Sequence, residues 1–300
     1  MNAMIDRACI SLTNKCNLKC KYCHFQDKQN NYSEFSIDDL KAIVDNIHDY
    51  CKQNHLEKFK LGIVGSGEPM LKFSTIIEIL NHIVENKYNE FNIYTITNGT
   101  LLNERKIKEL YKYKDLIKVC FSLDGYRELH NAGRMLYDNT ALAINFYCLT
   151  FGQMPSINAT VNLLSYQNKE KLIEFFQKYN LYDVTFSKLV GYFENDLYIT
   201  DEQFKEFMEY AEAKGMKSRQ FRKEKCYDCT MYGRLCGVGR TNIFITPEGI
   251  YPCGRFYKND KYLLGTFDSN LFEIEKKVNQ MKPVEDGKCY YIENVEGRNE

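Results

Sequence analysis

The sequence predicts an α/β protein built around a parallel sheet. Six short segments rich in Ile, Val, Phe, Tyr and Thr have the length of strands, and the five segments between them carry apolar residues at three- and four-residue spacing. Alternating strands and helices connect through right-handed crossovers. Because six such units close a cylinder only in part, we expect a partial (βα)6 TIM-like barrel over residues 1–200.

The elements of this barrel follow one another without a long gap. The predicted strands are 5–12, 58–64, 91–97, 116–123, 156–163 and 182–188, and the predicted helices are 36–54, 73–87, 103–114, 137–150 and 168–179. Ser36 and Asn103 are typical residues for a helix start. A further amphipathic helix over 201–214 begins near Thr200, and we expect 201–222 to bridge the barrel to the rest of the chain.

Residues 223–300 differ in amino-acid composition from the residues before them, because cysteine and glycine become frequent. Strand-like runs at 243–246 and 250–251 flank Pro247-Glu248-Gly249 and predict a β-hairpin. The segment is too short to bury a large core alone, and a bound metal would offset this. We therefore expect a small, cysteine-rich α+β domain.

The composition of the chain argues against several classes of protein. Forty basic residues balance forty acidic ones, which gives no general support for a nucleic-acid partner. No apolar run reaches membrane-spanning length, and the N-terminus lacks a signal-peptide layout, so we expect a cytoplasmic protein without a membrane partner. In a reducing compartment, the twelve cysteines predict metal binding or buried thiols rather than disulfides. The isolated cysteines fit core thiols: Cys9, Cys51, Cys120 and Cys148.

Cys16, Cys20 and Cys23 have the spacing C-x3-C-x2-C and follow the first predicted strand. Three thiolates on one loop can hold three irons of a [4Fe–4S] cube and leave the fourth iron open to a cofactor. The alternatives are a zinc site with His24 as a poor fourth ligand, or a redox pair.

With Tyr22 before its last cysteine, this loop resembles the cluster motif of the radical S-adenosylmethionine (AdoMet) superfamily. Ser66-Gly67-Glu68-Pro69, after the second strand, resembles the family's Gly-Gly-Glu-Pro motif, with serine in place of the first glycine. The resemblance implies that the cysteines hold a [4Fe–4S] cluster. It also implies that the backbone and carboxylate of the second motif bind the amino group of AdoMet.

A Ser-Leu-Asp-Gly segment at 122–125, followed by His130 and Arg134, resembles the anaerobic sulfatase-maturating and related peptide-modifying members. By this resemblance Ser122 contacts the AdoMet ribose and Arg134 the AdoMet carboxylate. Asn98 belongs to a Thr-Asn-Gly-Thr segment common in the same members, and we expect it at the cofactor site.

Cys236, Cys253 and Cys289, with Gly249 shortly before the second of them, resemble the auxiliary-cluster domain called SPASM and its shorter form, twitch. The resemblance implies one auxiliary [4Fe–4S] cluster, with Cys229 as the preferred fourth ligand. A zinc ribbon is the alternative.

Two residues are candidates for catalysis. Cys226 exceeds the four ligands that a cube needs. By resemblance to the family's peptide epimerases it donates a hydrogen atom, and otherwise it is a bystander or an alternate ligand. Asp124 either deprotonates a substrate or forms a turn.

The resemblance implies reductive cleavage of AdoMet to a 5′-deoxyadenosyl radical, with electrons from a donor such as flavodoxin or ferredoxin. The expected substrate is a ribosomally made peptide or protein side chain, modified by oxidation, cross-linking or epimerisation. The alternatives are a small-molecule dehydrogenase of natural-product biosynthesis, and a non-catalytic iron–sulfur or zinc module.

Overall fold

A computed structural model describes residues 4–23, 25, 33–189, 197–221, 236–285 and 288–296. One sheet holds the described strands in the order β6-β5-β4-β3-β2-β1-β7-β8. They are β1 (Arg7–Ile10), β2 (Phe59–Ile63), β3 (Phe91–Thr97), β4 (Ile117–Ser122), β5 (Ser156–Val161), β6 (Val184–Lys188), β7 (Asn242–Thr246) and β8 (Gly249–Tyr251). All six predicted barrel strands are present, so the predicted α/β barrel is confirmed.

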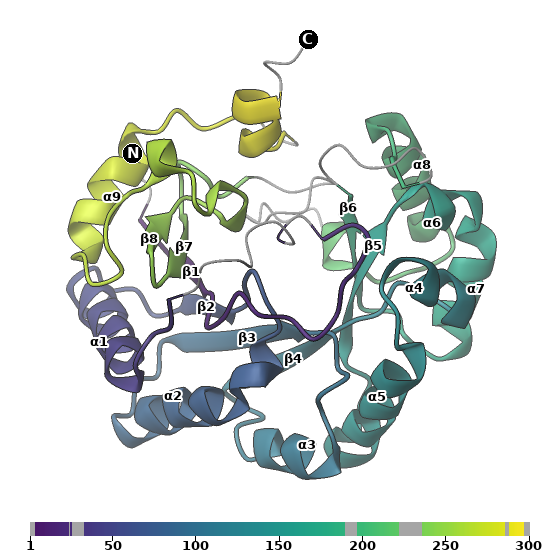
Figure 1. The fold of residues 1–300 in the computed structure, drawn as a ribbon, viewed down its shortest axis with the longest axis horizontal. Helices are drawn as coiled ribbons and strands as arrows, with labels where there is room; N and C mark the ends of the chain where they lie inside the picture. The colour runs from purple at the N-terminus through teal and green to yellow at the C-terminus, as the bar shows by residue number, and fades with distance from the viewer. Residues whose placement is uncertain are drawn as a thin grey trace.

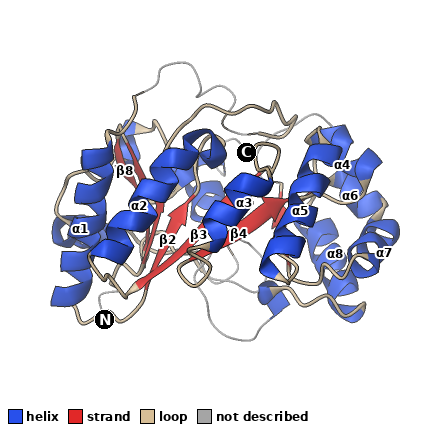
Figure 2. Cartoon of the chain, turned by 90° about the horizontal axis from the view of Figure 1, so that it is seen from below, coloured by secondary structure: helices blue, strands red, loops and turns tan. Residues whose placement is uncertain are grey.

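The helices lie outside the curved sheet (Figures 1 and 2). They are α1 (Ile37–Gln53), α2 (Phe73–Glu85), α3 (Glu104–Tyr111), α4 (Arg127–Gly133), α5 (Tyr137–Phe151), α6 (Leu163–Gln167), α7 (Lys169–Lys178), α8 (Asp201–Ala213) and α9 (Leu271–Gln280). The sequence did not predict α4, α6 or α9. The first two have only seven and five residues, which is too short for a readable apolar period.

Side chains alternate between the two faces of each barrel strand. On one face, apolar residues such as Ile63, Ile93 and Phe121 are fully or almost fully buried in the main hydrophobic core, together with the apolar sides of the helices. On the other face, Arg7 and Lys60 keep partial exposure. The core therefore lies between sheet and helices, and the lumen of the barrel is polar.

The C-terminal segment continues the barrel sheet. β7 runs parallel to β1, with Cys9 opposite Phe244, and β8 completes the predicted hairpin by pairing antiparallel to β7. A second apolar cluster, separate from the main core, is built from Val238, Phe244, Tyr251, Phe256, Tyr257 and Tyr290. The predicted boundary at 222/223 lies outside the described residues, and the division into domains stays a prediction.

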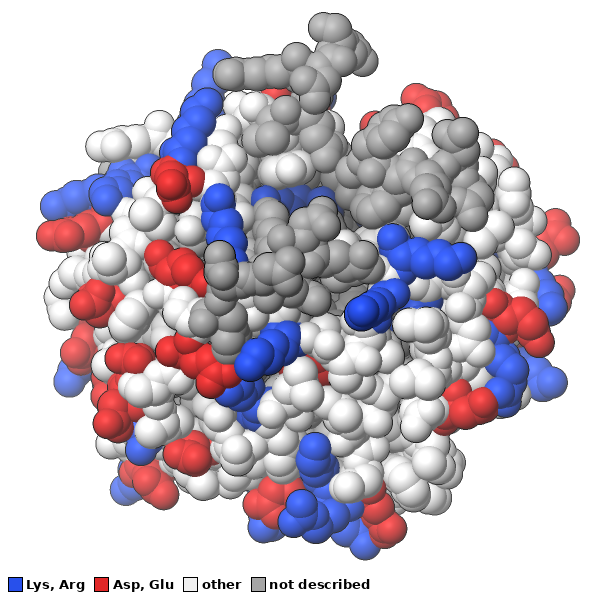
Figure 3. All heavy atoms as spheres, in the orientation of Figure 1, with Lys and Arg blue, Asp and Glu red and all other residues white. Residues whose placement is uncertain are grey.

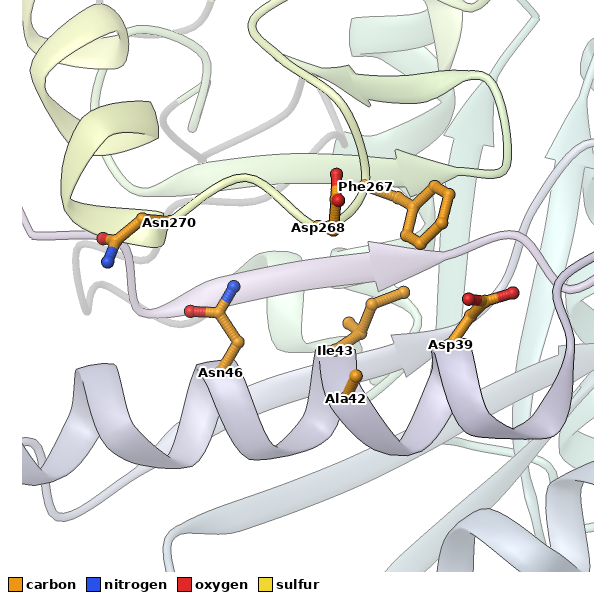
Figure 4. A pocket seen from close by; sticks show the side chains of 7 residues that line it. All are labelled: Asp39, Ala42, Ile43, Asn46, Phe267, Asp268 and Asn270. Atoms are coloured by element: carbon orange, nitrogen blue, oxygen red, sulfur yellow. The ribbon is translucent and has the colours of Figure 1, made fainter.

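The C-terminal segment also packs beside α1. The Asn46 side chain donates a hydrogen bond to the Ser269 carbonyl at 3.0 Å. A hollow of about 240 Å³ lies along this contact, lined from α1 and from the residues before α9 (Figure 4). In the part of the chain that the structure describes, no helix is long and apolar enough to span a bilayer.

Helix α1 begins at a capping box that the sequence predicts. The Asp39 amide donates to Ser36 Oγ at 3.1 Å, and the Ser36 amide donates to Asp39 Oδ2 at 2.8 Å. Ser36→Ala should therefore lower the free energy of unfolding by about 1 kcal/mol in urea denaturation followed by circular dichroism. Ser74→Ala, at an exposed serine in α2 that is not its N-cap, should change it by less than about 0.5 kcal/mol. Equal losses of unfolding free energy in the two variants would contradict the capping role of Ser36.

Candidate active site

The predicted site segments gather at one edge of the sheet. Residues 14–23 follow β1, 65–69 follow β2, 98–99 follow β3 and 124–125 follow β4. These strands are parallel, so their carboxyl ends meet at the edge where α/β proteins bind ligands. The Glu68 amide donates to the Lys15 carbonyl at 2.9 Å, which joins the first two segments directly.

Cys16, Cys20 and Cys23 lie on one compact loop. Cys20 is buried and the other two are half-buried. Burial raises the pKa of Cys16, and it raises the pKa of Cys20 to about 11. The loop is fixed to α4, because the Lys21 amide donates to the Gly133 carbonyl at 2.9 Å.

Among the described residues, no three His, Cys, Asp or Glu side chains are arranged to hold a metal ion. A single zinc ion needs its thiolates to meet at about 2.3 Å from one point. In a [4Fe–4S] cube, each thiolate binds a different iron, so the sulfurs stay further apart. His24, the alternative fourth ligand of a zinc site, lies outside the described residues.

Gly67 packs against the cysteine loop more closely than any other residue type could. A Cβ atom at this position would lie 2.3 Å from the Lys15 carbonyl oxygen and 2.6 Å from that of Thr13. The neighbouring Ser66 hydroxyl lies 3.1 Å from Ser11 Oγ. The glycine is required by this close approach of two backbones.

Glu68 is a buried carboxylate with three donors. Oε1 accepts from the Thr97 hydroxyl at 2.6 Å and from the Met70 amide at 3.0 Å, and Oε2 accepts from the Asn98 amide at 2.8 Å. Burial raises the pKa of Glu68, against the opposing effect of these hydrogen bonds. The side chain joins the ends of β2 and β3, and Oε2 retains capacity for a further donor. Pro69, which follows, opens a short 3₁₀ turn, Pro69–Lys72.

Asn98 connects the end of β3 to the cysteine loop. Its Nδ2 donates to Asn17 Oδ1 at 2.9 Å, and its Oδ1 accepts from the Thr100 amide at 2.9 Å. The Thr140 hydroxyl donates to the Asn98 carbonyl at 2.7 Å. The sequence predicted Asn98 at the site but gave no signal for Asn17, because no local pattern reveals a partner 81 residues away.

Asp124 is held by three elements. Oδ2 accepts from the Tyr22 hydroxyl and from Arg134 Nε at 3.2 Å, while Oδ1 accepts from the Thr160 amide at 2.9 Å and from Arg134 Nη2 at 3.4 Å. Burial alone would raise the pKa of Asp124, but Arg134 and these hydrogen bonds together hold it below its usual range. A general base needs an accessible lone pair and a pKa near the working pH. The environment of Asp124 instead suits the fixed partner of an ion pair.

His130 is buried as a neutral imidazole. The Asp124 amide donates to its Nδ1 at 3.3 Å, so Nε2 carries the proton and donates to the Met135 carbonyl at 3.1 Å. Burial lowers the pKa of His130, which agrees with this neutral form. The ring closes the turn between β4 and α4.

Arg134 lies over the ring of Tyr22, with 5.5 Å between the guanidinium carbon and the ring centroid. Its side chain is 14% exposed. A guanidinium has five N–H donors, and Asp124 takes two of them, so further donors can meet an anion. Ser122 lies buried at the end of β4, two residues before Asp124.

Of the C-terminal cysteines, Cys236 precedes β7 and Cys253 follows the antiparallel strand β8, so both lie toward the amino edge of the sheet. Cys236, Cys253 and Cys289 are half-buried, and burial raises the pKa of Cys236. A Cβ atom on Gly254 would lie 3.5 Å from the ring of Phe25, so the residue after Cys253 meets the residue two after Cys23. Cys226 and Cys229 lie outside the described residues.

Comparison with known proteins relates part of the chain to one superfamily. Residues 10–146 match the profile of the Radical SAM superfamily. This part of the chain, just under half of it, is similar to that superfamily. The match confirms the predicted resemblance to this superfamily, and the sulfatase-maturating relatives bear out the resemblance to its peptide-modifying members.

Two relatives and one solved structure are informative. The cysteine-type anaerobic sulfatase-maturating enzyme of Clostridium novyi is 30% identical over 182 residues, which are 55% of this chain and 46% of that protein. A GTP 3′,8-cyclase of Clostridium perfringens is 27% identical over 305 residues, covering 93% and 91% of the two chains. The structure of native anSMEcpe with bound AdoMet and Cp18Cys peptide superposes with a TM-score of 0.71 at 18% identity, over 95% of this chain and 86% of that one, and shows the shared fold. The chain spans less than half the length of three curated relatives that it matches.

Asp124→Asn should lower the free energy of unfolding by about 3 kcal/mol at pH 7, because it leaves the buried Arg134 charge without its counter-ion. The folded-state pKa of Asp124 lies below the ordinary value of about 3.9. Its contribution is therefore fully present above that value and is lost as the pH falls through the folded-state pKa. The difference in unfolding free energy between the variant and the wild type, measured by urea denaturation, should shrink as the pH falls below about 3.9.

Asp138→Asn is the matched control, because Asp138 pairs with Arg127 at an exposed position. It should change the free energy of unfolding by less than about 1 kcal/mol. Similar losses of unfolding free energy in the two variants would show that the buried Asp124–Arg134 pair stabilises the fold no more than an exposed ion pair does.

Proposed function

We propose that this protein is an enzyme that cleaves AdoMet reductively and takes a hydrogen atom from a peptide or protein side chain. The observation that carries the proposal is the meeting of three loop thiols, the Gly67–Glu68 segment and the Arg134–Tyr22 pair at one edge of the sheet, in the part of the chain that is similar to the Radical SAM superfamily. When bound, a [4Fe–4S] cluster supplies the electron that breaks a carbon–sulfur bond of AdoMet, giving methionine and a 5′-deoxyadenosyl radical.

Cys16, Cys20 and Cys23 are the proposed cluster ligands. Their loop is fixed to α4, so the three thiols keep their positions before the cluster arrives. Iron binds thiolates, and burial raises the pKa of Cys16 and Cys20, so cluster assembly must displace thiol protons. Three ligands leave one iron open for the amino and carboxylate groups of AdoMet.

The edge residues suit the two charged groups of that cofactor. Glu68 Oε2 has capacity to accept from the AdoMet ammonium, beside the backbone of Ser66 and Gly67. Arg134 has donors left for the AdoMet carboxylate while Asp124 and the Tyr22 ring hold its orientation. We also propose that Pro69 and Asn98 contact AdoMet and that Ser122 contacts its ribose.

We assign Cys236, Cys253 and Cys289, completed by Cys229, to one auxiliary [4Fe–4S] cluster in a twitch-like domain. The half-burial of the first three and the approach of Gly254 to Phe25 support this assignment. Cys226 as a hydrogen-atom donor remains a sequence-based hypothesis. We also retain a flavodoxin or ferredoxin as the expected electron donor.

A peptide substrate is supported by the sulfatase-maturating relative and by the peptide in the anSMEcpe structure. A small-molecule substrate is the second candidate. The observation that favours it is the GTP 3′,8-cyclase relative, which matches this chain over 91% of its own length.

Replacing Cys16, Cys20 and Cys23 together by alanine should abolish release of 5′-deoxyadenosine, because the electron for AdoMet cleavage then has no source. The assay uses anaerobically reconstituted protein, AdoMet and dithionite, with chromatographic detection. Cys148→Ala, which removes a half-buried thiol on α5, should leave release unchanged. Unaltered release from the triple variant would refute the ligand assignment.

Iron analysis tests the second cluster. Fully reconstituted protein should hold about eight irons per chain, and the triple variant about four, because each cube contains four. Zinc in place of the second four irons, or a total of about four irons per chain in the wild type, would overturn the auxiliary-cluster assignment.

A further inference from the structure

Three side chains close a ring of hydrogen bonds between the cysteine loop and the loop after β3. Asn17 Nδ2 donates to the Thr100 hydroxyl at 2.7 Å, and that hydroxyl donates to Asn98 Oδ1 at 2.7 Å. Asn98 Nδ2 in turn donates to Asn17 Oδ1 at 2.9 Å. Each of the three side chains therefore both donates and accepts, and the ring joins two segments that are about 80 residues apart in the chain.

The backbone fixes the direction of this ring. The Thr100 amide donates to Asn98 Oδ1 at 2.9 Å, so the oxygen of the Asn98 side chain, rather than its NH2 group, faces Thr100. The NH2 group of Asn98 then faces Asn17, which must present its oxygen there and its own NH2 group to Thr100. A flip of either asparagine would place two donors opposite each other. One backbone N–H thus selects a single arrangement of three side chains.

The ring is one of two contacts that flank Cys16. On one side, the Lys15 carbonyl accepts from the Glu68 amide at 2.9 Å, and on the other side the Asn17 side chain enters the ring. The ring is also connected to Glu68, because the Asn98 amide donates to Glu68 Oε2 at 2.8 Å. Cys16 and Glu68 are therefore tied together through both chain neighbours of Cys16.

The loop after β3 is shaped for this contact. Gly99 lies between the two ring residues of the loop and has a φ of +78°, in the left-handed region that favours glycine. A Cβ atom there would also lie 2.9 Å from the ring of Phe121. Asn98 is buried, whereas Asn17 is exposed. Because water competes for the hydrogen bonds of an exposed side chain, Asn17 contributes little to folding, and the directed bonds of the ring suit the positioning of two loops better.

Long-range electrostatics give a charged cofactor little guidance at this surface. Basic and acidic side chains are interspersed over the face shown in Figure 3, in keeping with a net charge of zero. The orientation of AdoMet must then come from short contacts, among them the one between its ammonium and Glu68 under the proposed function. A molecule that binds the open iron and Glu68 at once needs the two at a fixed separation.

We propose that Asn17 is a positioning residue for AdoMet, which holds the cysteine loop and Glu68 in register through the ring. Asn17 acts through Asn98 and does not itself touch AdoMet. The proposal rests on the proposed function, because it concerns the same cofactor. Loss of any one member opens the ring. The losses of two members should therefore have the same effect as the loss of one.

Calorimetric titration of anaerobically reconstituted protein with AdoMet tests this proposal. Asn17→Ala and Thr100→Val should each raise the Kd of AdoMet about fivefold, the effect of one lost hydrogen bond. The double variant should raise the Kd no further, because either change alone opens the ring. Thr100→Ser, which keeps the hydroxyl, should retain the wild-type Kd. Asn145→Ala, at an exposed asparagine of α5, should retain it as well.

Iron content should equal that of the wild type in every variant. The change that AdoMet makes to the electron paramagnetic resonance spectrum of the reduced protein should need about fivefold more AdoMet in Asn17→Ala. The proposal is wrong if Asn17→Ala keeps the wild-type Kd, if the effects of the two single variants add, or if Thr100→Ser binds as weakly as Thr100→Val. A lowered iron content in Asn17→Ala would also contradict it, because the residue would then serve cluster assembly.

Failure of the proposed function has a different result. A reconstituted wild type that neither binds AdoMet nor releases 5′-deoxyadenosine would overturn the proposed function and, with it, the role of Asn17. A wild type that does both, with variants that match its Kd, would overturn the role of Asn17 alone.

Discussion

Parallel pairing is the constraint on which this structure depends. From β6 to β7 in sheet order every neighbouring pair is parallel, so all these strands end at the same edge. Residues from the loops after β1, β2, β3 and β4 therefore meet although they are far apart in sequence. β7 pairs with β1 rather than forming a sheet of its own, so the hairpin that separates Cys236 from Cys253 extends the same sheet.

Two buried carboxylates stabilise the meeting of these loops. Glu68 holds the end of β2 to the end of β3, and Asp124 holds the cysteine loop, β5 and Arg134 to the end of β4. Burying such groups is costly unless their oxygens accept hydrogen bonds or face a counter-ion. Residues of the candidate site supply both the hydrogen bonds and the counter-ion. The stability of this edge and the position of its binding groups therefore depend on the same contacts.

The barrel has two chemically different ends. Thiols and buried carboxylates mark the carboxyl edge, whereas cations surround the lumen near the amino edge. A radical reaction requires its substrate to be held beside the reactive carbon and away from other hydrogen donors. The proposed radical chemistry therefore belongs to the carboxyl edge, where Cys16, Cys20 and Cys23 lie.

The sequence by itself determined the strands and most of the helices, because apolar periodicity and capping residues such as Ser36, Asn103 and Thr200 act locally. It also determined the cysteine spacing and the motif segments that indicate the superfamily. Each of these signals lies within a few residues of the chain.

Only the tertiary structure decided which side chains work together. The partners of Asp124 lie 10, 36 and 102 residues away, and no local pattern specifies such pairs. Cys51 and Cys120 are buried as expected, but Cys9 and Cys148 are half-buried, and both Cys9 and Cys120 line the lumen. Alternation along a strand shows that neighbouring residues face opposite ways, but not which face lies inward, because that depends on how the sheet curves and what covers it.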